Sequence, residues 1–188
     1  MRLNLLAGLV LAASVVALGG CATPANVQNM AVSGVDARVI NSASPLRDSV
    51  AVDKVIGGEE TNPLWTSEIS SEGFRQALTE SLRNAGLLAA MQGASKYALE
   101  VQLKNVQQPL VGLDMTVVAT VNYVLKERDT GVVVWEGDIV SPYTATFSQA
   151  FAGFERLRLA NEGSAKENIK QLIERLYSLD IKSAAVVN

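Results

Sequence analysis

Apolar and polar residues alternate along four segments of the chain, and this alternation predicts four β-strands. Side chains of a strand point alternately to the two faces of a sheet, so a period of two indicates one buried and one exposed face. In the clearest segment, Val117, Ala119 and Val121 fall on one face. The predicted strands cover 48–56, 97–104, 115–125 and 132–140, and a further short strand is expected around Val32–Ile40.

Two other segments have apolar residues at a spacing of three and four, which predicts helices with one buried face. The first spans about 72–85, with Ser70 or Ser71 as its N-cap and Gly86 after its last turn. The second spans about 152–179. Its buried stripe is predicted to comprise Phe154, Leu157, Asn161, Ser164, Ala165, Asn168, Leu172 and Leu176.

The order of these elements, β-α-β-β-β-α, predicts the fold class. The loop Asp129-Thr130-Gly131 favours a hairpin between the last two strands, because glycine can adopt the positive φ of a hairpin turn. A strand, a helical crossover and then hairpins imply one sheet with both helices on the same side. We therefore expect an α+β two-layer sandwich, in which a mostly antiparallel sheet of about four strands is covered on one face by two helices.

The N-terminus has the pattern of a secretory signal peptide. Arg2 is followed by an uninterrupted run of apolar or small residues from Leu5 to Leu18 and then by two glycines. A charged start, an apolar middle and small residues at the end are typical of such a peptide. The apolar run is short for a membrane span, which needs roughly 20 residues. The expected division is a signal peptide at 1–20, a lipidated cysteine and tether at 21–47, a single α+β domain at 48–181 and a frayed tail at 182–188.

The only cysteine of the chain, Cys21, directly follows this signal peptide. The residues Leu18-Gly19-Gly20-Cys21 resemble the lipobox of bacterial lipoproteins, in which the chain is cut before the cysteine and fatty acids such as palmitate are attached to it. The resemblance implies a membrane anchor on Cys21. Because residue 22 is Ala rather than Asp, it also implies sorting to the outer membrane, with the domain on the periplasmic face. The alternative is an ordinary signal peptide with a cysteine nearby by chance, but a lone thiol in a secreted protein has no partner for an internal disulfide.

Composition argues against several classes of function. The chain has no histidine, and with Cys21 lipidated this removes Ser-His-Asp and Cys-His catalysis and the common zinc sites. Its net charge is −3 and it has no basic run, whereas nucleic-acid binding requires clustered Lys and Arg. We expect no catalytic residues, no metal, no cofactor and no nucleic acid. A Ser-Lys pair or a carboxylate pair is arithmetically possible, but no motif marks one.

Residues 139–154 carry no charge, although 19% of the chain is charged. The stretch holds four of the ten aromatic residues, and a helical conformation would place Tyr143, Phe147, Phe151 and Phe154 on one side. The functional interpretation is that Tyr143, Phe147 and Phe151 contact a partner protein, a lipid or the membrane face. The alternative is that these rings pack the loop and the helix start onto the core, since aromatic side chains are mostly buried.

Leu64 and Trp65 form a second candidate contact, at an apolar loop tip between a strand and a helix. The alternative is a loop that covers the edge of the sheet. Gly57-Gly58 could suggest a phosphate-binding loop, but no Lys-Ser/Thr follows, so a turn is expected.

The last helix carries polar residues of two kinds. Those expected on a solvated face with paired charges are Arg156, Arg158, Glu162 and Lys166. Those on the apolar stripe, expected to bond to strand edges or to Arg158 and Glu162, are Asn161, Ser164 and Asn168.

Two stretches of the sequence resemble an uncharacterised group of proteobacterial lipoproteins. They are GGEETNPLWTSEIS, before the first helix, and RLRLANEGSAKENI, in the last helix. In general architecture the chain also resembles small envelope lipoproteins that assist larger machines, such as the LPS-assembly lipoprotein and the auxiliary lipoproteins of lipid transporters. The resemblance implies a protein that binds protein or lipid and catalyses nothing.

These observations predict a non-catalytic module that faces the periplasm and serves envelope assembly or transport. Its partners would be the membrane, through acyl chains on Cys21, and an envelope protein of unknown identity. The alternative is a carrier that holds a lipid or other amphiphile between sheet and helices, which would need a closed apolar cavity of roughly 300 Å³ or more. A hydrolase or transferase has no support in the sequence.

Overall fold

The structure is a computed structural model that describes residues 22–34, 44–62 and 67–181 of the chain. Several sequence predictions lie outside these residues: the signal peptide, the lipid attachment at Cys21, the contact candidates Leu64 and Trp65, and the tail 182–188.

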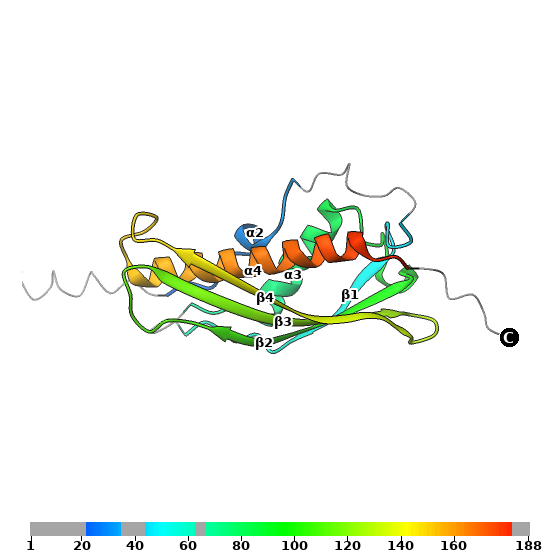
Figure 1. The fold of residues 1–188 in the computed structure, drawn as a ribbon, viewed down its shortest axis with the longest axis horizontal. Helices are drawn as coiled ribbons and strands as arrows, with labels where there is room; N and C mark the ends of the chain where they lie inside the picture. The colour runs from blue at the N-terminus through cyan, green and yellow to red at the C-terminus, as the bar shows by residue number, and fades with distance from the viewer. Residues whose placement is uncertain (1–21, 35–43, 63–66, 182–188) are drawn as a thin grey trace, which may run out of the picture.

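Four strands form one mixed sheet in the order β1-β2-β3-β4 (Figure 1). β1 (Val50–Ile56) pairs with β2 (Tyr97–Gln107) in parallel, because a helix connects them and returns the chain to the same end of the sheet. The hairpins join β2 to β3 (Met115–Glu127) and β3 to β4 (Val133–Ala145) in antiparallel pairs. The predicted element order and the α+β two-layer sandwich are confirmed. β4 continues to Ala145, beyond its predicted end.

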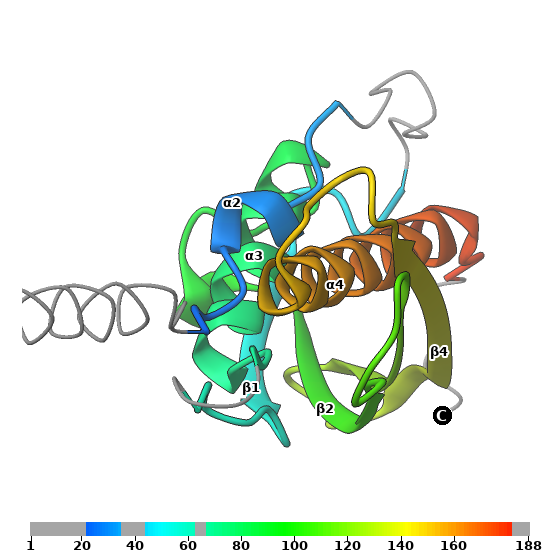
Figure 2. The same ribbon diagram turned by 90° about the vertical axis from the view of Figure 1, so that its left-hand side faces the viewer.

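Two helices cover one face of the sheet, as predicted. α3 (Ser71–Asn84) packs against β1, and α4 (Gly153–Ser178) lies along β3 and β4 (Figure 2). A one-turn helix that periodicity could not predict, α2 (Val27–Met30), contacts both α3 and α4. A short 3₁₀ helix, η3 (Gln92–Ala94), precedes β2.

Local signals explain the bounds of α3. The side chain of Ser70 accepts a hydrogen bond from the Gly73 amide at 3.1 Å, which satisfies one of the free N–H groups of the first turn. Gly86 follows the helix with φ of +65°, a conformation that glycine adopts without strain. The buried residues are those that the spacing predicts: Phe74, Ala77, Leu78, Ser81 and Leu82.

The main core lies between the sheet and the two helices. Its fully buried side chains include Leu99, Tyr123 and Leu125 from the strands and Ile169 and Leu172 from α4. A second, smaller cluster lies where β3 begins, β4 ends and α4 starts, and it comprises Met115, Val117, Ala145, Leu157 and Ala160. This second cluster supports the end of the molecule from which the β2–β3 and β4–α4 loops extend.

Polar residues on the buried stripe of α4 bond to the sheet. The amide of Asn168 donates to the Ile139 carbonyl at 3.0 Å and accepts from the buried Tyr123 hydroxyl at 2.7 Å. Ser164 accepts from the Ala119 amide at 3.0 Å and donates to the Ser141 carbonyl at 2.7 Å. Burial raises the pKa of Tyr123 well above 10. The partners of these two α4 residues are therefore groups of β3 and β4 rather than Arg158 or Glu162.

The described part of the predicted strand Val32–Ile40 is not a strand. Residues 32–34 have no regular structure, and Ala31 and Val32 are buried against the core. The Val32 amide donates to Ser81 Oγ at 2.8 Å and the Val32 carbonyl accepts from Asn84 at 3.0 Å, so α3 takes the bonds that a neighbouring strand would have taken.

The glycine pair after β1 has a structural reason. Gly57 has φ of +84°, and a Cβ at this position would overlap the Leu103 carbonyl of β2. A side chain at Gly58 would overlap the backbone at the start of α3. Close approach of backbone segments, rather than phosphate binding, therefore accounts for both residues.

Within the residues that the structure describes, no helix is both long and apolar enough to cross a bilayer.

Candidate functional site

Two loops project from the end of the molecule at which β3 begins and β4 ends (left in Figure 1). They are the β2–β3 loop, residues 108–114, and the β4–α4 loop, residues 146–152. Single exposed apolar side chains are normal on a protein surface, but large ones gathered in one place usually mark a contact site. We use the name apolar tip for the five large apolar residues that these loops expose: Leu110, Val111, Leu113, Phe147 and Phe151.

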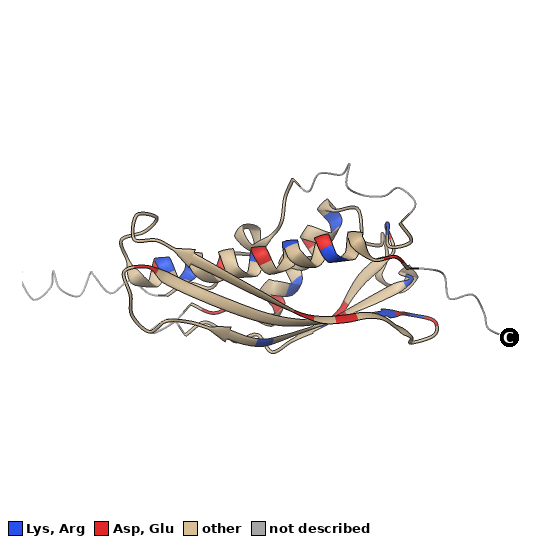
Figure 3. Cartoon of the chain, in the orientation of Figure 1, with Lys and Arg blue, Asp and Glu red and all other residues tan. Residues whose placement is uncertain are grey.

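The apolar tip is strongly exposed and nearly free of charge. Leu110 exposes 94% and Phe151 82% of its surface. Residues 105–113 and 139–154 contain no charged residue. Figure 3 shows almost no blue or red, the colours of charged residues, on the two loops. The charge closest to the tip on the β2–β3 loop is Asp114, whose carboxylate accepts a hydrogen bond from the Phe147 amide at 2.9 Å. This bond ties the two loops to each other.

Arg156, in the first turn of α4, joins the two loops from the inside. Its guanidinium donates to the carbonyls of Ala150 at 2.7 Å and Phe151 at 2.6 Å in one loop, and to the carbonyl of Gly112 at 3.3 Å in the other. It also lies 5.1 Å from the centre of the Phe147 ring. Arg156 is 5% exposed, so its predicted place on a solvated face is wrong. The physical reason is that these loop carbonyls need donors, and the forked guanidinium reaches all three.

The aromatic residues of the uncharged stretch do not share one helix face. β4 extends to Ala145 and includes Tyr143, whose ring packs on Gly163 of α4. Phe147 and Phe151 lie in the loop, edge to face, with ring centres 5.2 Å apart. Phe154 is half-buried in the first turn of α4. The structure therefore brings Phe147 and Phe151 together and places Tyr143 on the sheet. Burial onto the core does not account for the ring of Phe151.

The start of the described chain, residues 22–34, is fastened to the helices rather than extended away from them. Asn26 caps α2, and its side-chain oxygen accepts from the amides of Gln28 at 2.9 Å and Asn29 at 3.4 Å. Met30, at the end of α2, is completely buried. The sequence assigns these residues to a tether, and in the structure they are part of the packed body.

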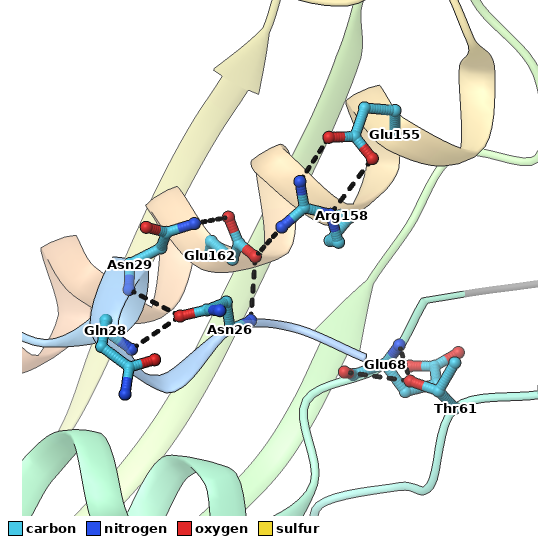
Figure 4. A network of polar contacts seen from close by, with 8 residues as sticks. All are labelled: Asn26, Gln28, Asn29, Thr61, Glu68, Glu155, Arg158 and Glu162. Carbon is cyan, nitrogen blue, oxygen red and sulfur yellow. Dashed lines mark hydrogen bonds and ion pairs between the residues drawn. The ribbon is translucent and has the colours of Figure 1, made fainter. Parts of the chain in front are cut away.

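Glu162 of α4 holds this segment (Figure 4). Its carboxylate accepts from the Asn26 amide at 2.8 Å, from the Asn29 side chain at 2.9 Å and from Arg158 at 2.6 Å. Arg158 also pairs with Glu155, and this bond raises the pKa of the Arg158 guanidinium. Glu162 is 2% exposed, so its predicted solvated position is wrong, because the N-terminal segment covers it. Its predicted pairing and the exposure of Lys166 are confirmed. We call Glu162, Arg158, Asn26 and Asn29 the N-terminal clamp.

Further bonds connect the N-terminal segment to the β2–β3 loop. The Ala25 amide donates to the Glu68 carbonyl at 3.4 Å. Gln108, at the start of the loop, donates to the Ser67 carbonyl at 3.1 Å, to the Glu68 carboxylate at 2.8 Å and to Asn161 of α4 at 3.2 Å. The segment 22–26 (dark blue) runs along the first turns of α4 toward the end with the two loops (Figure 1). The N-terminus of the described chain and the apolar tip therefore belong to the same end of the molecule.

An open groove of about 590 Å³ lies beside the apolar tip. Its walls come from the β2–β3 loop and the start of α4, and its apolar lining includes Leu110, Val111, Met115, Phe154 and Leu157. Among the described residues, no group of three or more Cys, His, Asp or Glu side chains could hold a metal ion.

Sequence reasoning missed three tip residues and one buried arginine. Leu110, Val111 and Leu113 stand between Pro109 and Asp114, in a hairpin loop where polar residues are the norm. That run of apolar residues was the available signal. Nothing in the local sequence distinguishes Arg156 from its exposed neighbours, because its burial depends on loops far away in the chain.

No protein-family model matches the sequence, and no curated protein matches it. Three solved structures illustrate the similarity in fold. A Xanthomonas campestris protein of the family DUF330 has a TM-score of 0.54 at 12% identity, over 76% of this chain and 90% of that one. A Caulobacter crescentus protein described as a candidate lipoprotein has a TM-score of 0.48 at 17% identity, over 69% and 88%. A minor lipoprotein of Acinetobacter baumannii has a TM-score of 0.46 at 7% identity, over 69% and 92%.

The last two structures are described as lipoproteins, and that description concerns those proteins. At such low identity the similarity concerns the fold. The likeness to LPS-assembly lipoproteins stays a prediction.

Proposed function

We propose that this protein is a non-catalytic lipoprotein, held in the outer membrane by acyl chains on Cys21, and that it serves envelope assembly or transport from the periplasmic face. The observation that carries the proposal is the single cysteine, Cys21, directly after the signal-peptide pattern, and the N-terminal clamp adds where such an anchor would hold the body. The chain that follows Cys21 is fixed to α4 through the buried Glu162. An anchor on Cys21 would therefore hold the folded body close to the lipid surface in a defined orientation, rather than on a long tether.

The chemistry of an acylated cysteine supports permanent attachment. Each buried CH₂ group contributes about 0.8 kcal/mol, and a single chain binds a membrane only marginally and reversibly. Two or three chains on Cys21 would make release negligible. The protein would then act where it is anchored.

The described ionisable groups support a role without catalysis. Perturbed pKa values in a cleft are typical of active sites. Here the hydrogen bond from Arg75 lowers the pKa of Glu72 to about 2, and bonds from Lys104 and Asn122 lower the pKa of Asp138, but both carboxylates lie on the open surface. Tyr123 has a raised pKa because it is completely buried in the core. Each of these shifts has a structural explanation.

The carrier hypothesis finds less support. The space between sheet and helices is occupied by packed core side chains such as Leu99, Val121 and Leu172. The groove beside the apolar tip is open and lies outside this interface. No observation on the described residues favours a ligand between the two layers.

A fractionation experiment tests the proposal. The full chain and its Cys21→Ser variant are expressed in a Gram-negative host, and both are followed by membrane fractionation and labelled palmitate. We expect the unaltered protein to carry label and to sediment with the outer membrane, and the variant to carry none and to leave that fraction. A variant that is still processed and still sediments with membranes without fatty acid would overturn the anchor. If the anchor is confirmed, crosslinking in intact cells would identify the envelope partner of the anchored protein.

A further inference from the structure

We propose that the apolar tip is a second membrane contact, which inserts into the same lipid leaflet as the acyl chains of Cys21. The inference rests on the proposed lipid anchor and adds to it a surface of the folded body. It also gives the molecule an orientation.

The tip residues are held outward by the structure beneath them. Loops with apolar side chains usually fold those side chains onto the nearest core, since that removes apolar area from water. Here Arg156 fixes the carbonyls of both loops, and Asp114 bonds the Phe147 amide. With their backbones fixed in this way, the loops present Leu110 and Phe151 to the outside.

The position of the N-terminus indicates a lipid surface as the occupant. Cys21 is covalently joined to Ala22, and consecutive Cα atoms are about 3.8 Å apart. The segment 22–26 lies at the end that carries the tip, and Glu162 and the Glu68 carbonyl bind it there. Acyl chains that start at Cys21 therefore bring this end of the body, and not the opposite one, to the membrane.

The chemistry of the tip fits hydrocarbon better than a charged partner. Leucine, valine and phenylalanine at loop ends, without a protruding Lys or Arg in 105–113 or 139–154, match the apolar side of an interfacial membrane contact. Its charged neighbours, Arg156 and Asp114, are occupied by hydrogen bonds to the loops. Binding should therefore depend little on anionic lipids or on salt.

Two contacts at one end set the orientation of the molecule. α4 and the long strands run away from the tip, and the β3–β4 turn lies at the opposite end (Figure 1). The far end, with the exposed Val132, would point into the periplasm and would be free to meet an envelope partner.

Spin labels on the mature lipoprotein test this inference. In a lipidated protein the sulfur of Cys21 is blocked, so a cysteine introduced elsewhere is the only free thiol. Leu110→Cys and Phe151→Cys place labels on the tip, and Val132→Cys is the matched control, an exposed apolar residue at the far end. Each purified lipoprotein is reconstituted into phosphatidylcholine vesicles, and the collision rates of the label with oxygen and with a water-soluble nickel complex are measured.

We expect the ratio of oxygen to nickel collisions to be severalfold higher at both tip positions than at Val132→Cys. Equal ratios at all three positions, with Cys21 blocked, would overturn the membrane contact and leave the anchor intact. A second outcome would also overturn the membrane contact, in favour of a protein partner. In that outcome the tip labels collide with the nickel complex in vesicles but are shielded from both oxygen and nickel in native outer membranes. A Cys21 that itself reacts with the label would refute the anchor, and the inference would fall with it.

Discussion

Replacing Glu162 by glutamine should release the N-terminal segment from α4. The buried carboxylate accepts three hydrogen bonds, from the Asn26 amide, the Asn29 side chain and Arg158. A neutral amide of the same shape keeps one acceptor oxygen and turns a donor group toward the donors. The N-terminal clamp would therefore lose its charge and part of its bonding.

The magnitude follows from the partners that remain. A hydrogen bond to a charged group contributes about 1.5–3 kcal/mol, and breaking a buried ion pair costs about 3–5 kcal/mol. Arg158 keeps Glu155 as a partner, and the Asn29 side chain can turn to water. We therefore expect the free energy of unfolding to fall by about 3 kcal/mol, at the lower end of the range for a buried pair.

Urea unfolding of the purified lipoprotein in mild detergent would measure this change. Glu167→Gln is the control, because Glu167 lies on the same helix, is partly exposed and bonds only Gln171 and Lys170 in the described contacts. This surface substitution should change the free energy of unfolding by no more than about 0.5 kcal/mol. Amide exchange should rise across 26–31 in Glu162→Gln alone. A loss of less than about 1 kcal/mol, or unchanged exchange in this segment, would refute the clamp.

Three further predictions concern the packing of α4 and the loops. Arg156→Lys should lower the free energy of unfolding by about 2–4 kcal/mol, because an ammonium group cannot donate to all three loop carbonyls in this geometry. Amide exchange should rise in both tip loops. An unfolding curve like that of the unaltered protein would contradict this. Gly163→Ala should destabilise by about 1–3 kcal/mol, since its Cβ would overlap the ring of Tyr143. In a Tyr143→Ala background it should instead stabilise by up to about 1 kcal/mol, and a double-mutant cycle without this reversal would show that the contact is absent. Because burial raises the pKa of Tyr123 well above 10, its neutral form stabilises the fold fully below pH 10, and this contribution is lost as pH rises above 10 toward the folded pKa. Stability above pH 10 should therefore fall more steeply than in Tyr123→Phe, and parallel pH profiles would disprove the assignment.

The parts of the fold that follow from local patterns were predictable. α3 has a serine cap, a regular apolar face and a glycine after its last turn, and its five buried residues are those that the spacing indicates. β3 alternates between buried and more exposed residues from Met115 to Leu125, and the loop at 129–131 forms the expected hairpin between β3 and β4. These signals lie within a few residues of the elements that they define.

The parts that depend on distant contacts were not predictable. α2 is one turn long, too short for a periodic signal, and Met30 is buried because α2 packs on both α3 and α4. Arg156 and Glu162 look like exposed helix residues until loops and the N-terminal segment cover them. Phe147 and Phe151 were found from a lack of charge, but their helical arrangement was wrong, because β4 pairs with β3 as far as Ala145.

Mass spectrometry of the N-terminal peptide, from protein extracted out of the outer membrane, tests the anchor most directly. The account predicts a peptide that begins at Cys21 and carries a diacylglyceryl group on sulfur, with residues 1–20 absent. A mature chain with an unmodified Cys21 thiol, or one that begins elsewhere, would contradict it.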